Sequence, residues 1–141
     1  MALLRVAKRL LSSFVGHFAE AGISPGKYTI LAILFEHGAG LPPSVLAKRS
    51  GVTRATVTGL IDGLERDGYV ERTARPSEDR RTVLITLTDK GARFMTGFLP
   101  GHLDRLESIT RALNDKELKA LLALLERVER GLGPLRIEQE P

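Results

Sequence analysis

Residues 50–66 read Ser-Gly-Val-Thr-Arg-Ala-Thr-Val-Thr-Gly-Leu-Ile-Asp-Gly-Leu-Glu-Arg, and this stretch decides the fold. Thr53 is a good helix N-cap, because its hydroxyl can accept a hydrogen bond from a backbone N–H of the first turn. The apolar residues that follow recur at helical spacing: Val57, Leu60, Ile61 and Leu64. Gly68 is well placed to end the helix, because glycine tolerates the left-handed backbone found there. The stretch therefore predicts an amphipathic helix that follows a tight turn at residues 50–52.

Helix and strand signals flank this amphipathic helix. A short helix is predicted from Pro42-Pro43 to the residue before Gly51. Residues 69–73 and 81–87 are rich in β-branched residues, and the polar stretch between them has turn chemistry. The order helix, turn, helix, hairpin over residues 41–91 is that of a winged helix-turn-helix. In this fold the second helix enters the major groove of DNA. The hairpin, called the wing, lies on the adjacent backbone or minor groove. We expect a mainly α fold with a small β-hairpin wing (α+β).

The side of the second helix opposite its apolar face is a candidate DNA surface. Small residues at Ala55 and Gly59 let the backbone sit close to base edges, while threonine hydroxyls and arginines can bond phosphate or bases. The candidate contacts on this helix are Thr53, Arg54, Ala55, Thr58, Gly59 and Arg66, and Ser44 is a further candidate in the short helix before it. Asp62 on the same side would repel phosphate unless a cation pairs with it, either Arg66 or a wing arginine. Taken alone, the pattern also fits an ordinary solvent-exposed face.

The predicted hairpin concentrates positive charge, because Arg72, Arg75, Arg80 and Arg81 lie within ten residues of each other. An arginine near a hairpin tip can enter the narrow minor groove, where a neighbouring carboxylate can hold its guanidinium in position. Asp79 and Arg81 have the i, i+2 spacing that places two side chains on one face of a strand. Arg75, Asp79, Arg80 and Arg81 are therefore candidate wing contacts. The alternative is a solvated charged turn.

Longer helices are predicted on both sides of the winged region. Apolar residues at three- and four-residue steps predict helices over residues 1–22, 24–38, about 88–111 and 114–131. Pro100-Gly101 should kink or interrupt the third of these. Asn114 and Glu117 have the spacing of a capping box, with asparagine in place of the usual serine or threonine.

The two ends of the chain carry more apolar surface than a winged helix needs for its own core. The surplus in residues 1–22 and 92–132 predicts helices that form a homodimer interface. The alternative is a monomer in which these helices pack on the DNA-binding region. We expect a single domain over residues 1–141, with residues 133–141 as a tail.

Composition narrows the function. The net charge of +4 favours a polyanionic partner, and the absence of cysteine excludes disulfides, thiolate metal sites and thiol redox switches. The three histidines are scattered, so no metal or other cofactor is expected. No apolar run approaches the roughly 20 residues of a membrane span, and the first residues do not have the pattern of a secretory signal, which fits a cytoplasmic protein. Because no catalytic motif is present, an enzyme is not expected.

Several short motifs together resemble the MarR family. They are Leu46-Ala47, residues 51–58, Leu64-Glu65, Gly68-Tyr69-Val70, Asp79-Arg80-Arg81 and residues 87–91, so the likeness is dense over residues 41–91. The resemblance implies a dimer with interlocked first and last helices, recognition helices in successive major grooves, and an Asp79–Arg81 pair for minor-groove contact. It also implies a transcription regulator, by family default a repressor, on a pseudo-palindromic operator. Gly59 departs from the family, whose members commonly carry a basic residue there.

The resemblance further implies a small aromatic or anionic effector, bound between the dimer helices and the winged region, that weakens DNA binding. Candidate lining residues are Phe14, His17, Phe18, Tyr28 and Phe35, each of which also fits an ordinary core or surface position. A second class of function is a winged helix that docks a protein in place of DNA. Binding of that kind would lack the steep salt dependence of phosphate contacts.

Overall fold

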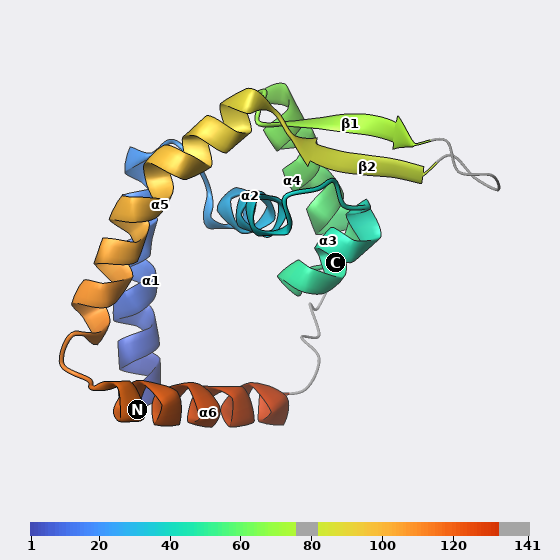
Figure 1. Cartoon of the computed structure of the whole chain (residues 1–141). Helices are drawn as coiled ribbons and strands as arrows, with labels where there is room; N and C mark the ends of the chain where they lie inside the picture. Colours follow the sequence, from blue (N-terminus) through green and yellow to red (C-terminus); the bar gives the residue numbers. More distant parts are fainter. Residues whose placement is uncertain (76–81, 133–141) are drawn as a thin grey trace, which may run out of the picture. The chain divides into compact units, whose positions relative to one another are not determined.

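The computed structural model describes residues 1–75 and 82–132. Within these residues the chain forms six α-helices and one two-stranded antiparallel hairpin (Figure 1). In chain order the elements are α1 (Ala2–Glu20), α2 (Pro25–His37), α3 (Pro43–Ser50), α4 (Arg54–Arg66), β1 (Val70–Arg75), β2 (Thr82–Leu87), α5 (Asp89–Thr110) and α6 (Asp115–Leu132). The mainly α class and the order helix, turn, helix, hairpin are confirmed.

The chain divides into two compact units, Met1–Pro100 and Gly101–Pro141, and the division falls inside α5. The helix itself runs unbroken through Pro100, so of the two predicted outcomes the interruption is wrong and the kink stays a prediction. Proline removes one backbone N–H donor but leaves the other i→i−4 bonds of a long helix available, which allows the helix to continue across it.

The hydrophobic core of the first unit is built by the end of α1, by α2, α3 and α4, by the hairpin and by the first turns of α5. Its buried side chains are Phe18, Ile23, Ile30, Leu31, Leu34, Leu41, Leu46, Ala47, Val57, Ile61, Leu64, Val70, Ile85 and Met95. Complete burial of one large aliphatic side chain stabilises a fold by about 1.5–3 kcal/mol. This core therefore fixes α4 firmly against α2, α3 and β1.

Side-chain caps set the starts of four helices, as the sequence predicts. Ser24, Thr53 and Thr88 each accept a hydrogen bond from the backbone N–H three residues further on, at 3.1–3.2 Å. Asn114 and Glu117 form the full capping box: each side chain accepts from the other residue's backbone N–H, at 3.0 and 2.9 Å. Local sequence alone decides these boundaries, because every partner lies within one helical turn.

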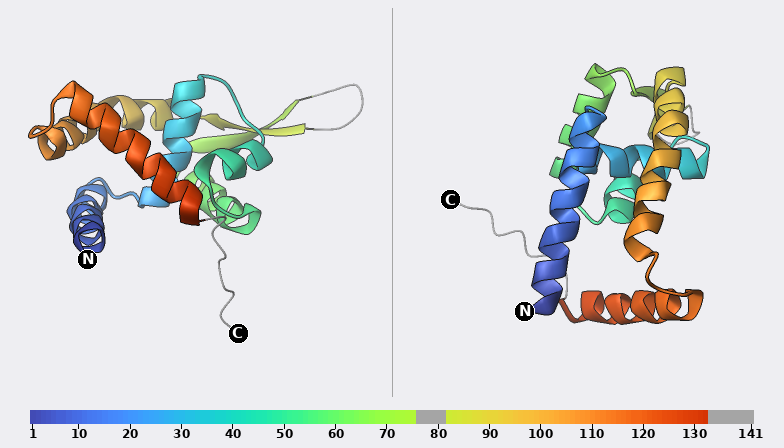
Figure 2. Two further views of the ribbon diagram at one scale, coloured as in Figure 1. Left: turned by 90° about the horizontal axis from the view of Figure 1, so that it is seen from below. Right: turned by 90° about the vertical axis from the view of Figure 1, so that its left-hand side faces the viewer.

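The hairpin is anchored to the start of α3 as well as to α4. β1 and β2 pair with Arg72 opposite Ile85, and Leu41 adds an isolated bridge to Ile85 through two backbone hydrogen bonds of 3.0 and 2.9 Å. The sequence does not predict this bridge, because a single bridging residue has no periodicity. The hairpin extends outward from the helices that hold its root (Figure 2). Its root is therefore held from two sides.

Candidate nucleic-acid interface

The turn between α3 and α4 has the conformation that the sequence requires. Gly51 follows α3 with φ +70°, and its N–H donates to the Ala47 carbonyl at 3.1 Å. This left-handed backbone is one that glycine adopts without the steric cost of a Cβ atom. The Thr53 cap then starts α4 two residues later. The helix-turn-helix is thus closed by backbone geometry and one side-chain cap.

The face of α4 that points away from the core carries the predicted DNA contacts. Val57, Ile61 and Leu64 are buried, whereas an opposite set is exposed: Thr53, Arg54, Ala55, Thr58, Gly59 and Arg66. A Cβ built on Gly59 would meet nothing within 4 Å, so this side of the helix is open. The orientation of the face is as predicted, and its contact with DNA stays a prediction.

Hydrogen bonding limits what the threonines of this face can do. The Thr58 hydroxyl donates to the Arg54 carbonyl at 2.9 Å. With its hydrogen used in this way, Thr58 can offer a base an acceptor oxygen or its methyl group, but it has no hydrogen left for a phosphate. The Thr53 and Thr56 hydroxyls lie 2.9 Å apart, which holds both at the N-terminus of α4.

The N-terminal part of the motif adds basic side chains that sequence reasoning did not single out. Ser44, a predicted DNA contact, is exposed in the first turn of α3. Lys48 and Arg49 are exposed in the last turn of α3, directly before the turn into α4. Their place beside the turn could have been noticed from the sequence, because basic residues close to a helix-turn-helix are typical phosphate contacts.

The root of the wing, which is the end of the β1–β2 hairpin nearest the helices, pairs with α4 through Arg72. Its Nη2 atom donates to Asp62 Oδ1 at 2.5 Å, and its Nη1 atom donates to Glu65 Oε2. The hydrogen bond to Asp62 is the main reason that the pKa of Arg72 is raised above its ordinary value. Of the two cations considered for Asp62, the structure therefore selects a wing arginine and not Arg66.

A second set of contacts joins the C-terminal end of α4 to α2 and α5. Lys27 Nζ lies 2.6 Å from Asp67 Oδ2, and this hydrogen bond lowers the pKa of the Asp67 carboxyl. Lys90 Nζ donates to the Asp67 carbonyl at 2.6 Å and lies 4.8 Å from the centre of the Tyr69 ring. The Thr88 hydroxyl donates to the Gly68 carbonyl at 2.6 Å. The C-terminal half of α4 is thus held by polar contacts to α2, to β1 and to the start of α5.

Most of the predicted wing contacts lie outside the described residues. Asp79, Arg80 and Arg81 belong to residues 76–81, and Arg75 is described only as the last residue of β1, paired with Thr82. The Asp79–Arg81 pair and the wing contacts therefore stay predictions.

Four of the five predicted effector residues come together in an aromatic cluster, which consists of Phe14, His17, Phe18, Tyr28, Phe94 and Phe98. His17 stacks on Phe98 with ring centres 4.7 Å apart, and Tyr28 lies 5.1 Å from Phe18 and 5.4 Å from Phe98. Burial raises the pKa of Tyr28. Sequence reasoning missed Phe94 and Phe98, which stand one helical turn apart on α5 and stack at 5.5 Å.

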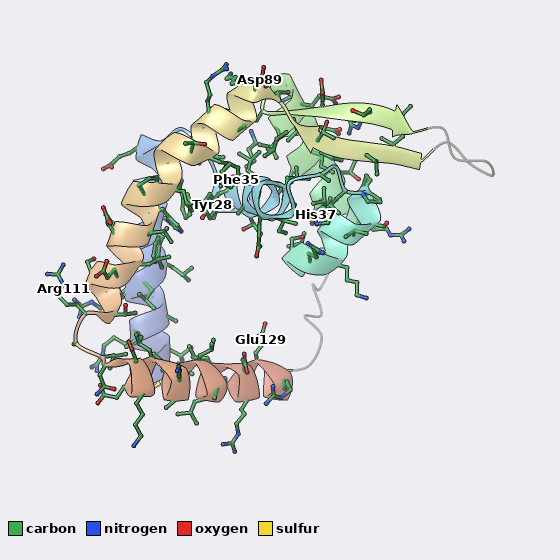
Figure 3. The ribbon with its side chains drawn as sticks, in the orientation of Figure 1. Tyr28, Phe35, His37, Asp89, Arg111 and Glu129 are labelled. Atoms are coloured by element: carbon green, nitrogen blue, oxygen red, sulfur yellow. The ribbon has the colours of Figure 1, made fainter. Side chains whose placement is uncertain are left out.

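Phe35, the fifth predicted residue, lies elsewhere. Tyr28 is near the start of α2 and Phe35 near its end (Figure 3). Phe35 borders a cavity of about 310 Å³ between the Gly38–Gly40 loop, β2 and Ala92. Phe35 is therefore not part of the aromatic cluster, because about two helical turns separate it from Tyr28 along α2. That all five residues line one effector site stays a prediction.

Neither a metal-binding cluster nor a membrane-spanning helix is found among residues 1–75 and 82–132. No group of three or more His, Asp or Glu side chains there could hold a metal ion. No helix among these residues is long and apolar enough to cross a membrane.

Comparison with known proteins gives consistent likenesses. A sequence profile of the MarR family matches residues 23–83. The HTH-type transcriptional repressor YetL of Bacillus subtilis (strain 168) is 40% identical over 133 residues, covering 91% of this chain and 79% of YetL. The structure of NadR in complex with 4-hydroxyphenylacetate matches with a TM-score of 0.73 at 27% identity, over 90% of this chain and 89% of NadR. The transcriptional regulator PA4135 matches with a TM-score of 0.76 at 26% identity, over 92% and 93% of the two chains.

Proposed function

The chain belongs to the MarR family of transcriptional regulators, and we propose that it is a homodimeric repressor that reads a pseudo-palindromic operator in double-stranded DNA. The observation that carries the proposal is the division of α4 into a buried apolar face and an exposed face of small and basic residues. Small side chains at Ala55 and Gly59 allow close approach to base edges, and Arg54 and Arg66 reach outward from the two ends of the helix. The name of the relative YetL supports repression over activation.

The homodimer is supported by apolar surface that each compact unit leaves uncovered. In the first unit, α1 exposes Leu3, Leu4, Val6, Leu11 and Val15. In the second unit, exposed apolar side chains lie along the end of α5 and the middle of α6: Leu103, Leu106, Ile109, Leu121, Leu122, Leu124, Leu125 and Val128. Soluble monomers rarely expose contiguous apolar surface of this extent. A second copy of the chain would cover it and would set two α4 helices about one turn of DNA apart.

An effector in the aromatic cluster would give the regulator its signal. The cluster joins α1, α2 and α5 through stacked and tilted rings, which suits an aromatic ligand. NadR, a structural relative, was solved with 4-hydroxyphenylacetate, an aromatic carboxylate. Such a ligand would release DNA only if it binds the DNA-free arrangement more tightly than the DNA-bound one.

The test of DNA binding is fluorescence anisotropy with labelled duplex from upstream of the protein's own gene, at two salt concentrations and with unrelated duplex as competitor. We expect tight binding that resists the competitor and weakens steeply with salt, because each neutralised phosphate releases counterions. Binding no tighter than to unrelated duplex on any upstream fragment would contradict the proposal. A weak salt dependence would instead favour protein docking.

The effector is tested on the preformed complex by titration with 4-hydroxyphenylacetate. We expect the anisotropy to fall in the wild type and in Phe35→Leu, whose ring lies outside the aromatic cluster, but not in Phe98→Leu, which removes the ring at its centre. Release that is equal in the two variants would place the ligand elsewhere.

A further inference from the structure

Arg72 occupies a position between the core and the DNA-facing surface. Alternate residues of a strand share a face, so Arg72 lies on the same side of β1 as Val70, which is buried in the core. One step further out, its guanidinium reaches both Asp62 and Glu65 on α4. These two acids stand three positions apart, which places them as neighbours on the helix surface. A single guanidinium therefore donates hydrogen bonds to two carboxylates.

The two carboxylates would oppose DNA binding if they stood alone. Asp62 belongs to the exposed side of α4 together with Ala55 and Gly59, and Glu65 is exposed beside it. Uncompensated negative charge at this surface would repel phosphate, and the two acids would also repel each other. Because Arg72 lies within hydrogen-bond distance of both, one of their two negative charges is offset before any DNA approaches.

The same contacts leave Arg72 poorly suited to bind phosphate itself. Bidentate recognition of phosphate uses the parallel N–H groups of the guanidinium fork. Here Nη1 and Nη2 each donate to a different carboxylate. A phosphate would have to displace at least one of these partners.

We propose that Arg72 is a positioning residue for DNA binding: it offsets one of the two negative charges of Asp62 and Glu65, holds the wing root against α4, and does not contact phosphate. This inference rests on the proposed function, because it assigns a role within DNA binding. The inference gives the wing arginines two different roles: Arg72 at the root pairs with carboxylates of the protein itself, while the arginines nearer the tip are the candidate DNA contacts.

The experiment compares Arg72→Gln, Arg72→Lys and the neutral triple variant Arg72→Gln/Asp62→Asn/Glu65→Gln with the wild type. Affinity for the upstream duplex is measured by anisotropy over a series of salt concentrations. Arg54→Gln is the matched control, because it removes an exposed arginine that is a candidate phosphate contact. Circular dichroism and urea unfolding confirm that each variant folds, and exposed ion pairs of this kind contribute little to stability.

We expect Arg72→Gln to weaken binding roughly tenfold, as loss of a functional arginine typically does. Arg72→Lys should retain most of the affinity, because it keeps the charge. The triple variant should return to within about threefold of the wild type with an unchanged salt slope, whereas Arg54→Gln should lower the slope by about 0.9. Recovery of DNA affinity when Asp62 and Glu65 are made neutral is the outcome that a purely structural role of Arg72 would not produce.

Two results would overturn the inference. In the first, the triple variant stays as weak as Arg72→Gln and its salt slope falls by about 0.9, which would make Arg72 a phosphate contact. In the second, Arg72→Gln binds as tightly as the wild type. If the wild type itself binds no upstream duplex, the proposed function fails and the inference with it, so the two failures are told apart by the wild-type measurement.

Discussion

The carbonyl oxygen of Tyr69 occupies the space in which a side chain on Gly91 would have to begin. A Cβ built on Gly91 would stand closer to this oxygen than any real contact allows. The same carbonyl accepts a hydrogen bond from the Thr88 backbone N–H at 3.1 Å. The start of α5 is therefore packed directly on the backbone that leads from α4 into the wing, with no room for a side chain between them.

Gly91→Ala should destabilise the protein, because neither backbone can move without breaking its hydrogen bonds. We expect a loss of about 1–3 kcal/mol in the free energy of unfolding, measured by urea titration. Gly59→Ala is the matched control: its Cβ would meet nothing within 4 Å in the middle of α4, so the gain in helix propensity should raise stability by about 0.5–1 kcal/mol. Equal stability of Gly91→Ala and the wild type would contradict the close packing.

The Lys27–Asp67 ion pair should make stability depend on pH in acid. The pKa of Asp67 is lowered below its ordinary value of 3.8, chiefly by the hydrogen bond from Lys27. The contribution of the pair is therefore complete above this value and is lost as the pH falls through the lower pKa of the folded state. Asp67→Asn should cost less than about 1 kcal/mol at neutral pH, because solvent screens the pair, and the difference should shrink in acid.

The measurement is the free energy of unfolding of both proteins from neutral pH into the acid range below 3.8, the ordinary pKa of the Asp67 carboxyl. Lys27→Met removes the same pair and should flatten the acid dependence equally. A difference between wild type and Asp67→Asn that stayed constant across this range would assign the effect to something other than the ion pair.

Charged substitutions on α1 and α6 should dissociate the proposed dimer. Leu11 and Leu122 are 68% and 59% exposed, so Leu11→Lys and Leu122→Lys should leave each unit folded while placing charge in the interface. Light scattering should then report monomers, and operator affinity should fall. Val83→Lys, at an exposed apolar position on the wing, is the control and should remain dimeric. A Leu11→Lys or Leu122→Lys variant that stayed dimeric would show that the interface lies elsewhere.

Arg81→Ala should weaken operator binding by roughly 1–3 kcal/mol and reduce the salt slope, if this arginine enters the minor groove. The measurement is the anisotropy titration over several salt concentrations. Unchanged affinity would remove Arg81 from the interface and would leave α4 as the main DNA-reading element.

Gly59→Lys tests the place where this chain departs from its family. Because the position is open, a lysine can extend toward the DNA backbone without disturbing the core. We expect tighter binding to operator and unrelated duplex alike, with a salt slope steeper by about 0.9, since a phosphate contact carries no sequence information. A gain confined to the operator would show instead that the lysine reads a base.

The sequence by itself determined the features whose causes are local. These features are the Thr53 cap, the capping box of Asn114 and Glu117, and the tight turn at Gly51. Each involves partners within a few residues, so composition and spacing were sufficient to predict them. The split of α4 into two faces followed in the same way from the helical period.

Only the tertiary structure decided which distant residues meet. Asp62 had two candidate partners, and the choice of Arg72 depended on the pairing of β1 and on how the hairpin packs on α4. Phe98 belongs to the aromatic cluster and Phe35 does not, because the rings of α1 and α5 meet α2 at Tyr28, near its start. Sequence periodicity fixes which face of an element is buried, but the neighbour that covers that face follows from packing across the whole core.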